Sequence, residues 1–109
     1  MKKKVYICAP LTNDMVETMA QIRVYVEYAL QCGVAPVVPH FYWLCMSPDT
    51  AINAEILRSA SRSLLWYCDE MWIFGDEVTE QMTSDLQFCK DLHLRTKRIR
   101  SLKVPKQHK

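Results

Sequence analysis

The stretch VYICAP at residues 5–10 decides the fold that we expect for this chain. Its first five residues are almost all apolar and rich in β-branched or aromatic side chains, and Pro10 ends the run. Such near-continuous apolarity is typical of a parallel strand that is covered on both faces. Residues 5–9 therefore predict a first strand inside a sheet.

Helix and strand patterns alternate after this first strand. The expected elements are a helix over residues 14–32 that stops at Gly33, a strand over 34–38, an aromatic loop over 40–46, a helix from Ser47-Pro48 to about Tyr67, a strand over 69–74, a helix capped by Thr79 that stops before Arg95, and a last strand around 97–102. This order predicts an α/β fold, a small Rossmann-like parallel sheet of four to five strands with helices on both faces.

Composition bounds the class of protein. A chain of 109 residues that is half apolar can bury one core, so we expect one domain at residues 1–102 and a basic tail at 103–109. No run of about 18 uncharged apolar residues is present, and the first residues turn polar too soon for a signal peptide. We therefore expect a soluble, cytoplasmic protein without a membrane partner.

The five cysteines and the charges exclude further classes. The cysteines are odd in number and form no C-x-x-C pair, so we expect neither a disulfide framework nor a metal site; Cys89 and His93 have helical spacing but no third ligand. Residues 5–94 contain all twelve acidic residues and only four basic ones. The charged residues of 95–109 are all basic. A solvated tail is favoured over nucleic-acid binding, because no aromatic residue is interleaved there.

The chain has only two glycines, Gly33 and Gly75, so neither a G-x-G-x-x-G fingerprint nor a P-loop is present. We expect no dinucleotide cofactor. A ligand phosphate would have to be held by helix amino termini and backbone donors near residues 11–14 or 78–81.

Candidate site residues gather at the predicted carboxyl ends of the strands, where doubly wound sheets bind ligands. The expected ligand-binding set is Ala9, Pro10, Leu11, His40, Phe41, Gly75, Asp76, Thr79, Gln81 and Met82. Asp85 borders the apolar stripe of its helix, so its carboxylate can point inward, although the pattern alone favours a solvent-facing residue. His40 either binds a ligand or packs after the preceding proline, and Phe41 either stacks on a base or covers a neighbouring subunit.

Three motifs together resemble a family of small bacterial and phage domains related to nucleoside 2-deoxyribosyltransferases. They are VYICAP at residues 5–10, PVVPH at 36–40 and CDEMWIFGD at 68–76. The resemblance implies a Rossmann-like sheet and a pocket for a nucleoside or its monophosphate. It also implies a carboxylate nucleophile in the helix after the third motif, oriented by a tyrosine of the first strand. Matched by motif, the two catalytic positions are Asp85 and Tyr6.

Two departures from that family bear on catalysis. The usual nucleophile is glutamate, and Asp85 is one methylene shorter, which removes about 1.5 Å of reach. Gln81 stands where relatives commonly carry glycine, so a side chain narrows the expected pocket.

Three functions stay open. The first is an N-glycosidic bond hydrolase or deoxyribosyltransferase. The second is a non-catalytic protein that sequesters or senses a nucleotide-derived signalling molecule, of a phage or mobile-element type. The third is an interaction protein that docks a macromolecule through its aromatic loop and basic tail. We also expect a homo-oligomer, because a chain this short has limited means to bury its aromatic residues alone, and because the resembled transferases form oligomers.

Overall fold

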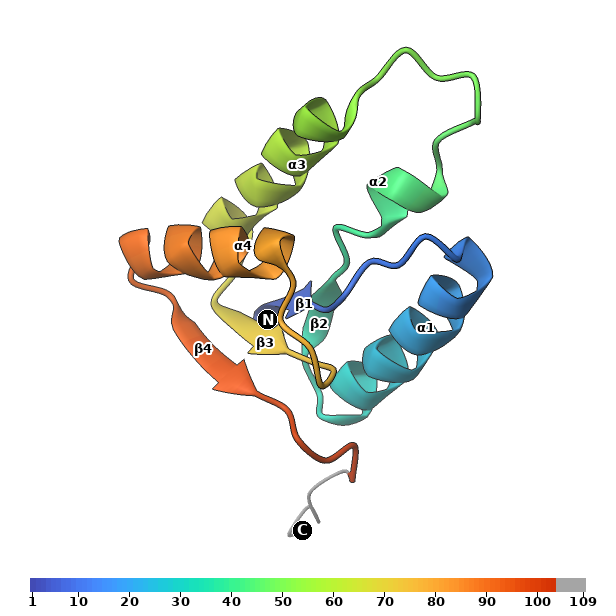
Figure 1. Ribbon diagram of the computed structural model, residues 1–109. Coiled ribbons are helices and arrows are strands. Elements are labelled where there is room, and N and C mark those ends of the chain that lie inside the picture. Colours follow the sequence, from blue (N-terminus) through green and yellow to red (C-terminus); the bar gives the residue numbers. More distant parts are fainter. Residues whose placement is uncertain (104–109) are drawn as a thin grey trace, which may run out of the picture.

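A four-stranded parallel sheet with the order β2-β1-β3-β4 forms the centre of the computed structural model, which describes residues 1–103 (Figure 1). The strands are β1 (Lys4–Cys8), β2 (Ala35–Val37), β3 (Glu70–Ile73) and β4 (Arg95–Arg98). In the register of the sheet, Tyr6 pairs with Val37 on one side and with Met71 on the other. The expected parallel α/β sheet is confirmed, with four strands. The predicted basic tail lies, apart from Lys103, outside the described residues.

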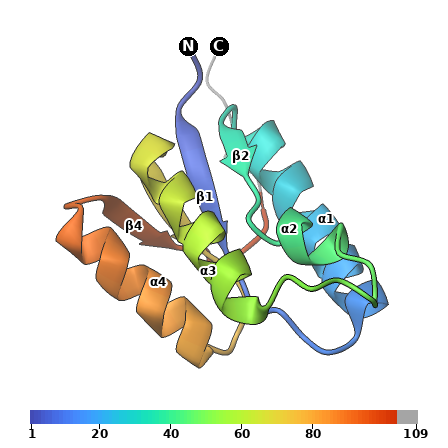
Figure 2. The ribbon, with the colours of Figure 1, turned by 90° about the horizontal axis from the view of Figure 1, so that it is seen from above.

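The helices cover both faces of this sheet, as expected. They are α1 (Met15–Gln31), the one-turn α2 (Phe41–Leu44), α3 (Ala54–Ser63), the 3-10 helix η1 (Leu64–Tyr67) and α4 (Glu80–Asp91). Figure 2 shows α1 on one side of the sheet and α3 with α4 on the other. No helix among residues 1–103 has both the length and the apolarity that crossing a bilayer requires.

Alternation of side chains along the strands divides the core into two clusters, one on each face of the sheet. Val5, Ile7, Trp72 and Phe74 pack with α1, where the ring of Tyr25 stacks on Phe74 at 4.5 Å between centroids. The opposite cluster consists of Tyr6, Cys8, Leu65, Cys68, Met71, Ile73, Met82 and Cys89. The two-residue period of β1 therefore turns Tyr6 toward α4.

The third helix begins later than the sequence predicted. We expected a start at Ser47-Pro48, but α3 starts at Ala54, where the side chain of Asn53 accepts a hydrogen bond of 3.0 Å from the Ile56 amide. Upstream, the Thr50 amide donates to the Ser47 carbonyl, and the Thr50 hydroxyl accepts from the Ile52 amide at 3.2 Å. These local hydrogen bonds satisfy the backbone amides of residues 50 and 52 in a turn, which competes with the start of a helix at this point.

Two smaller corrections concern the aromatic loop and the last strand. Residues 41–44 form the short helix α2 within the predicted loop of 40–46. The last strand spans Arg95–Arg98, not 97–102, because His93 adopts a left-handed φ of 57° that ends α4 abruptly. The chain then enters β4 at once, and its cations suit the exposed edge of a sheet.

The order of the strands places a crevice at the carboxyl ends of β1 and β3. The chain passes from β1 outward to β2 and then returns across β1 to β3, so the connections reverse direction between these two central strands. Such a switch point leaves a gap in which α/β proteins bind their ligands. The residues that follow β1 and β2, and the start of α4, line a small cavity at this end of the sheet.

Candidate functional site

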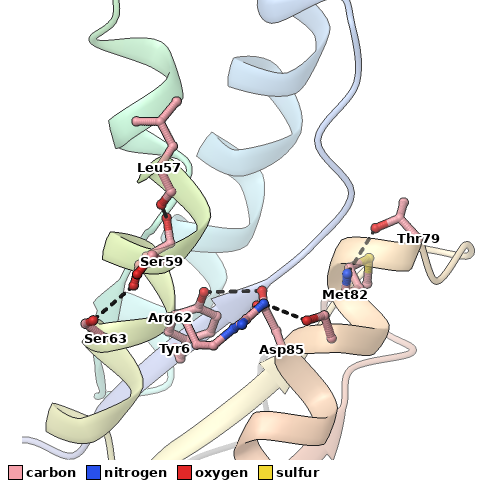
Figure 3. A network of polar contacts seen from close by, with 10 residues as sticks. Tyr6, Leu57, Ser59, Arg62, Ser63, Thr79, Met82 and Asp85 are labelled. Atoms are coloured by element: carbon pink, nitrogen blue, oxygen red, sulfur yellow. Dashed lines mark hydrogen bonds and ion pairs between the residues drawn. The ribbon is translucent and has the colours of Figure 1, made fainter. Parts of the chain in front are cut away.

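The side chains of Tyr6 on β1 and Asp85 on α4 lie next to each other, with Arg62 of α3 beside them (Figure 3). The Tyr6 hydroxyl donates a hydrogen bond of 3.3 Å to Oδ2 of Asp85, although 79 positions separate the two residues. Tyr6 is fully buried and Asp85 is 7% exposed. The structure therefore brings the two predicted catalytic residues together, and Asp85 does not face bulk solvent.

Arg62 is a third member of this group, and our sequence reasoning did not include it. Its Nε lies 3.8 Å from Oδ1 of Asp85, and its Nη2 donates a hydrogen bond of 2.6 Å to the Ser84 hydroxyl. The guanidinium carbon also lies 5.8 Å from the centre of the Phe88 ring. Arg62 thus joins α3 to α4 over the carboxylate. The sequence gives one hint of a role for Arg62, since residues 5–94 contain only four basic residues.

Burial and neighbouring charges shift the pKa values of this group. Burial raises the pKa of Asp85, and the Arg62 charge and the Tyr6 hydrogen bond act in the opposite direction. Burial, together with the charge of Asp85, raises the pKa of Tyr6. The same causes raise the pKa of Cys8 on β1 to about 12. Tyr6 and Cys8 therefore stay protonated near neutral pH, and Tyr6 acts as a hydrogen-bond donor.

A small cavity of about 10 Å³ lies beside Asp85 at the end of β1. Of the expected ligand-binding set, it is lined by Ala9, Leu11, His40, Thr79, Gln81 and Met82. Its volume is about that of one water-sized sphere, so it does not hold a sugar or a base as it stands. The side chains of Gln81 and Met82 and the ring of Trp43 are among those that narrow it.

The other expected ligand-binding residues lie elsewhere. Pro10, Gly75 and Asp76 line a separate groove near α1, because Gly75 turns the chain toward that face with a φ of +89°. Phe41 is half exposed and does not line the cavity. Trp43 lines the cavity in place of Phe41. The two residues are two positions apart in α2, and such a step places side chains on nearly opposite faces of a helix.

His40 presents an unused hydrogen-bond acceptor in this region. The residue is 6% exposed, and its Nε2 lies 2.9 Å from the Ala9 carbonyl, which can only accept, so Nε2 carries the proton. Burial lowers the pKa of His40, which keeps the ring neutral. Its Nδ1 is buried and has no hydrogen-bond partner among residues 1–103. A hydroxyl of a bound molecule, or a water, would satisfy this nitrogen.

A larger groove of about 560 Å³ opens next to the cavity, between α3 and α4. It shares Leu11, Thr79 and Gln81 with the cavity, and Arg58 and Arg62 of α3 line its other side. Its volume lies within the range of about 300–1,000 Å³ that small-molecule sites occupy. The cavity with Asp85 and this groove are therefore adjacent, separated by a shared wall, and together form the candidate site.

In the part of the chain that the structure describes, no three His, Cys, Asp or Glu side chains are grouped so as to hold a metal ion. The polar groups at the site are a carboxylate, a phenol, an imidazole and two guanidinium groups. Such a set suits hydroxyl and phosphate groups of an organic ligand.

Comparison with known proteins gives a family and a fold. Residues 3–99 match the model of a family described as "Domain of unknown function (DUF7768)". No curated protein matches the sequence. Among solved structures, the chain is similar to a 2-deoxyribosyltransferase from the psychrotolerant bacterium Bacillus psychrosaccharolyticus, with a TM-score of 0.67 and 13% sequence identity. The match covers 87% of this chain and 70% of that one, so the two share a fold.

Proposed function

The chain belongs to the DUF7768 family, and we propose that it binds a nucleoside or nucleotide-derived ligand at the carboxyl end of β1, beside the start of α4, and cleaves its N-glycosidic bond. The observation that carries this proposal is the buried Asp85 carboxylate, oriented by the Tyr6 hydroxyl at 3.3 Å and bordering a cavity at the switch point of the sheet. The fold shared with a 2-deoxyribosyltransferase supports the same ligand class.

In this proposal Asp85 acts as a nucleophile. Its Oδ forms a bond to the anomeric carbon while the bond from that carbon to the base nitrogen breaks, and the base leaves with the electron pair and gains a proton from solvent. A water, or a second base, then attacks the same carbon and releases the sugar from Asp85. Tyr6 holds the carboxylate in place during both steps, and Arg62 offsets the effect of burial on its charge.

The ligand enters through the groove between α3 and α4. The cavity of about 10 Å³ is too small for a sugar, whereas the adjoining groove of about 560 Å³ is large enough. Gln81 lines both spaces and is only partly buried, so movement of its side chain would join them. Binding therefore includes a rearrangement of Gln81.

Binding without turnover is the second candidate function. It is favoured by the ion pair between Asp85 and Arg62 and by the short reach of an aspartate, both of which make the carboxylate a weaker nucleophile. A protein of this kind would sequester or sense an intact nucleotide-derived molecule. It uses the same site, so one experiment separates the two functions.

The experiment combines thermal unfolding with product analysis over a panel of nucleosides and their 5′-monophosphates. A ligand at 100 times its dissociation constant stabilises the fold by about 2.7 kcal/mol, which raises the melting temperature. Cleavage appears as free base in chromatography. Asp85→Asn is expected to abolish base release, and Asp91→Asn, the same change at an exposed position of α4, to preserve it.

The outcomes separate the candidates. Base release that depends on Asp85 supports the enzyme. A stabilising ligand that is recovered intact after denaturation overturns cleavage and supports sequestration. If no member of the panel changes the melting temperature or is cleaved, the site does not bind this ligand class.

We further propose that the protein self-associates in the cytoplasm. Two exposed aromatic residues support self-association, since Trp66 is 68% and Tyr67 is 72% exposed.

A further inference from the structure

We propose that the groove between α3 and α4 is an anion subsite, in which Arg58 and Arg62 bind the phosphate of the ligand. The ligand class is then a nucleoside monophosphate and not the free nucleoside. This inference rests on the proposed function, because it assigns a second part of the same ligand to the space beside Asp85.

The position of the groove suits a phosphate attached to the sugar. Leu11, Thr79 and Gln81 form a wall common to the groove and to the Asp85 cavity. A ligand with its sugar at Asp85 therefore extends its next substituent past these residues and into the groove. The groove, at about 560 Å³, is large enough for a phosphate and its hydration water.

The charge of the groove also suits an anion. Arg58 and Arg62 lie four residues apart on α3, so their side chains leave the same face of the helix. They are two of only four cations in residues 5–94, and both line this one groove. Planar guanidinium groups bind phosphate oxygens in pairs of parallel hydrogen bonds, which makes arginine well suited to this ligand.

Both arginines have hydrogen-bond donors to offer. Arg58 is exposed and forms no ion pair with another of residues 1–103. Arg62 uses Nη2 for the Ser84 hydroxyl, and its buried Nε faces Asp85, so Nη1 is the donor that it has left for a ligand among the described residues. Ser84 also lines the groove, and while its oxygen accepts from Arg62, its own proton remains free to donate.

Two acidic residues oppose the anion, and one of them is Asp85, which already pairs with Arg62. Glu80 lines the same groove at the start of α4, and it is exposed. Its carboxylate reduces the positive potential of the two arginines, so removal of its charge should strengthen binding. The subsite therefore predicts opposite effects for two neighbouring charge changes, Arg58→Gln and Glu80→Gln.

Calorimetric titration of the full chain tests this inference with matched pairs of probes, each nucleoside against its own 5′-monophosphate. We expect the monophosphate to bind about tenfold more tightly at low salt. Arg58→Gln should remove most of this difference, Glu80→Gln should increase it, and added salt should reduce it. Arg23→Gln, a change of an exposed arginine on α1, should leave the difference unchanged. Thermal unfolding confirms that each variant is folded.

The results distinguish failure of the subsite from failure of the proposed function. If a nucleoside and its monophosphate bind equally well, or if Arg58→Gln leaves their difference intact, the anion subsite is wrong while the nucleoside site stands. If neither member of any pair binds the wild-type chain, both are wrong.

Discussion

Asp85 occupies a position where burial works against its charge. The carboxylate is 7% exposed, and its pKa is raised although Arg62 and Tyr6 act to lower it. A residue that destabilises the fold in its ionised form is typical of a functional site, where activity and stability conflict. This property can be measured without knowing the ligand.

We predict that Asp85→Asn stabilises the protein at neutral pH. A carboxyl group with a raised pKa in the folded state contributes most to stability when it is protonated, below its unfolded pKa, and that contribution is lost as pH rises through the folded pKa. The neutral asparagine avoids this loss, so the free energy of unfolding at pH 7 should rise by about 0.5–2 kcal/mol. Urea denaturation of both proteins at pH 7 measures the difference.

The same titration at low pH provides an internal check. Where Asp85 is protonated in both states, the advantage of Asp85→Asn should shrink toward zero. Asp91→Asn on the exposed face of α4 should change stability by less than about 0.5 kcal/mol at either pH. A variant Asp85→Asn that is less stable than the wild type at pH 7 would show that the ion pair with Arg62 outweighs the cost of burial.

Arg62 should set the ionisation of Asp85. Its guanidinium lies 3.8 Å from the carboxylate and is the strongest influence that lowers this pKa. We predict that Arg62→Met raises the pKa of Asp85 further and that Arg62→Lys, which keeps the charge, retains a value closer to the wild type. Titration of the carboxyl carbon by NMR measures both. Equal pKa values in wild type and Arg62→Met would show that the ion pair does not act in solution.

At the scale of elements, the turn after β3 depends on Gly75. The residue has a φ of +89°, and a Cβ built on it would lie 3.0 Å from Cδ of Pro10. We predict that Gly75→Ala destabilises the protein by about 1–2 kcal/mol from its left-handed backbone. Displacement of the Pro10 ring should add about 1 kcal/mol. Chemical denaturation gives the total.

Gly33 is the matched control for this prediction. It has a φ of +85°, but nothing lies within 4 Å of the Cβ position. Gly33→Ala should therefore show the backbone cost alone, and the difference between the two variants isolates the contact with Pro10. Equal costs for both substitutions would mean that the turns after β1 and β3 are not packed together as described.

The order of the elements was predictable from the sequence, whereas several of their boundaries were not. The buried strand at residues 5–9 and the Thr79 cap follow from local composition, and the structure contains β1 and α4 accordingly. The predicted start of α3 at Ser47-Pro48 was wrong because hydrogen bonds of Thr50 form a turn there. A serine-proline pair alone does not reveal such a turn. A helix cap and a side-chain turn compete for the same backbone groups, and residue propensities do not show which of the two forms.

At the scale of the whole molecule, the topology brings the site together. Alternation along β1 turns Tyr6 toward α4, and the residues that follow β1 and β2 line the cavity beside Asp85. The family resemblance implied the proximity of Tyr6 to Asp85, whereas the helix pattern alone favoured a solvent-facing Asp85. Arg62 could not be inferred, because its contact with Asp85 depends on how α3 packs against α4, and the helix pattern does not determine this packing.

Self-association is the last property that we predict for the whole molecule. Trp66 and Tyr67 are more than two thirds exposed at the end of η1, and Trp66 contacts Phe88 of α4 edge-on at 6.3 Å between ring centres. Exposed aromatic groups of this size are costly in water, and a second copy of the chain would cover them.

Sedimentation velocity should show a species heavier than the 12.8 kDa chain at micromolar concentration. The double variant Trp66→Ser with Tyr67→Ser should dissociate it, while Val16→Ser, an exposed apolar change on α1, should not. A wild-type protein that sediments as a single chain would show that these aromatic residues serve another purpose.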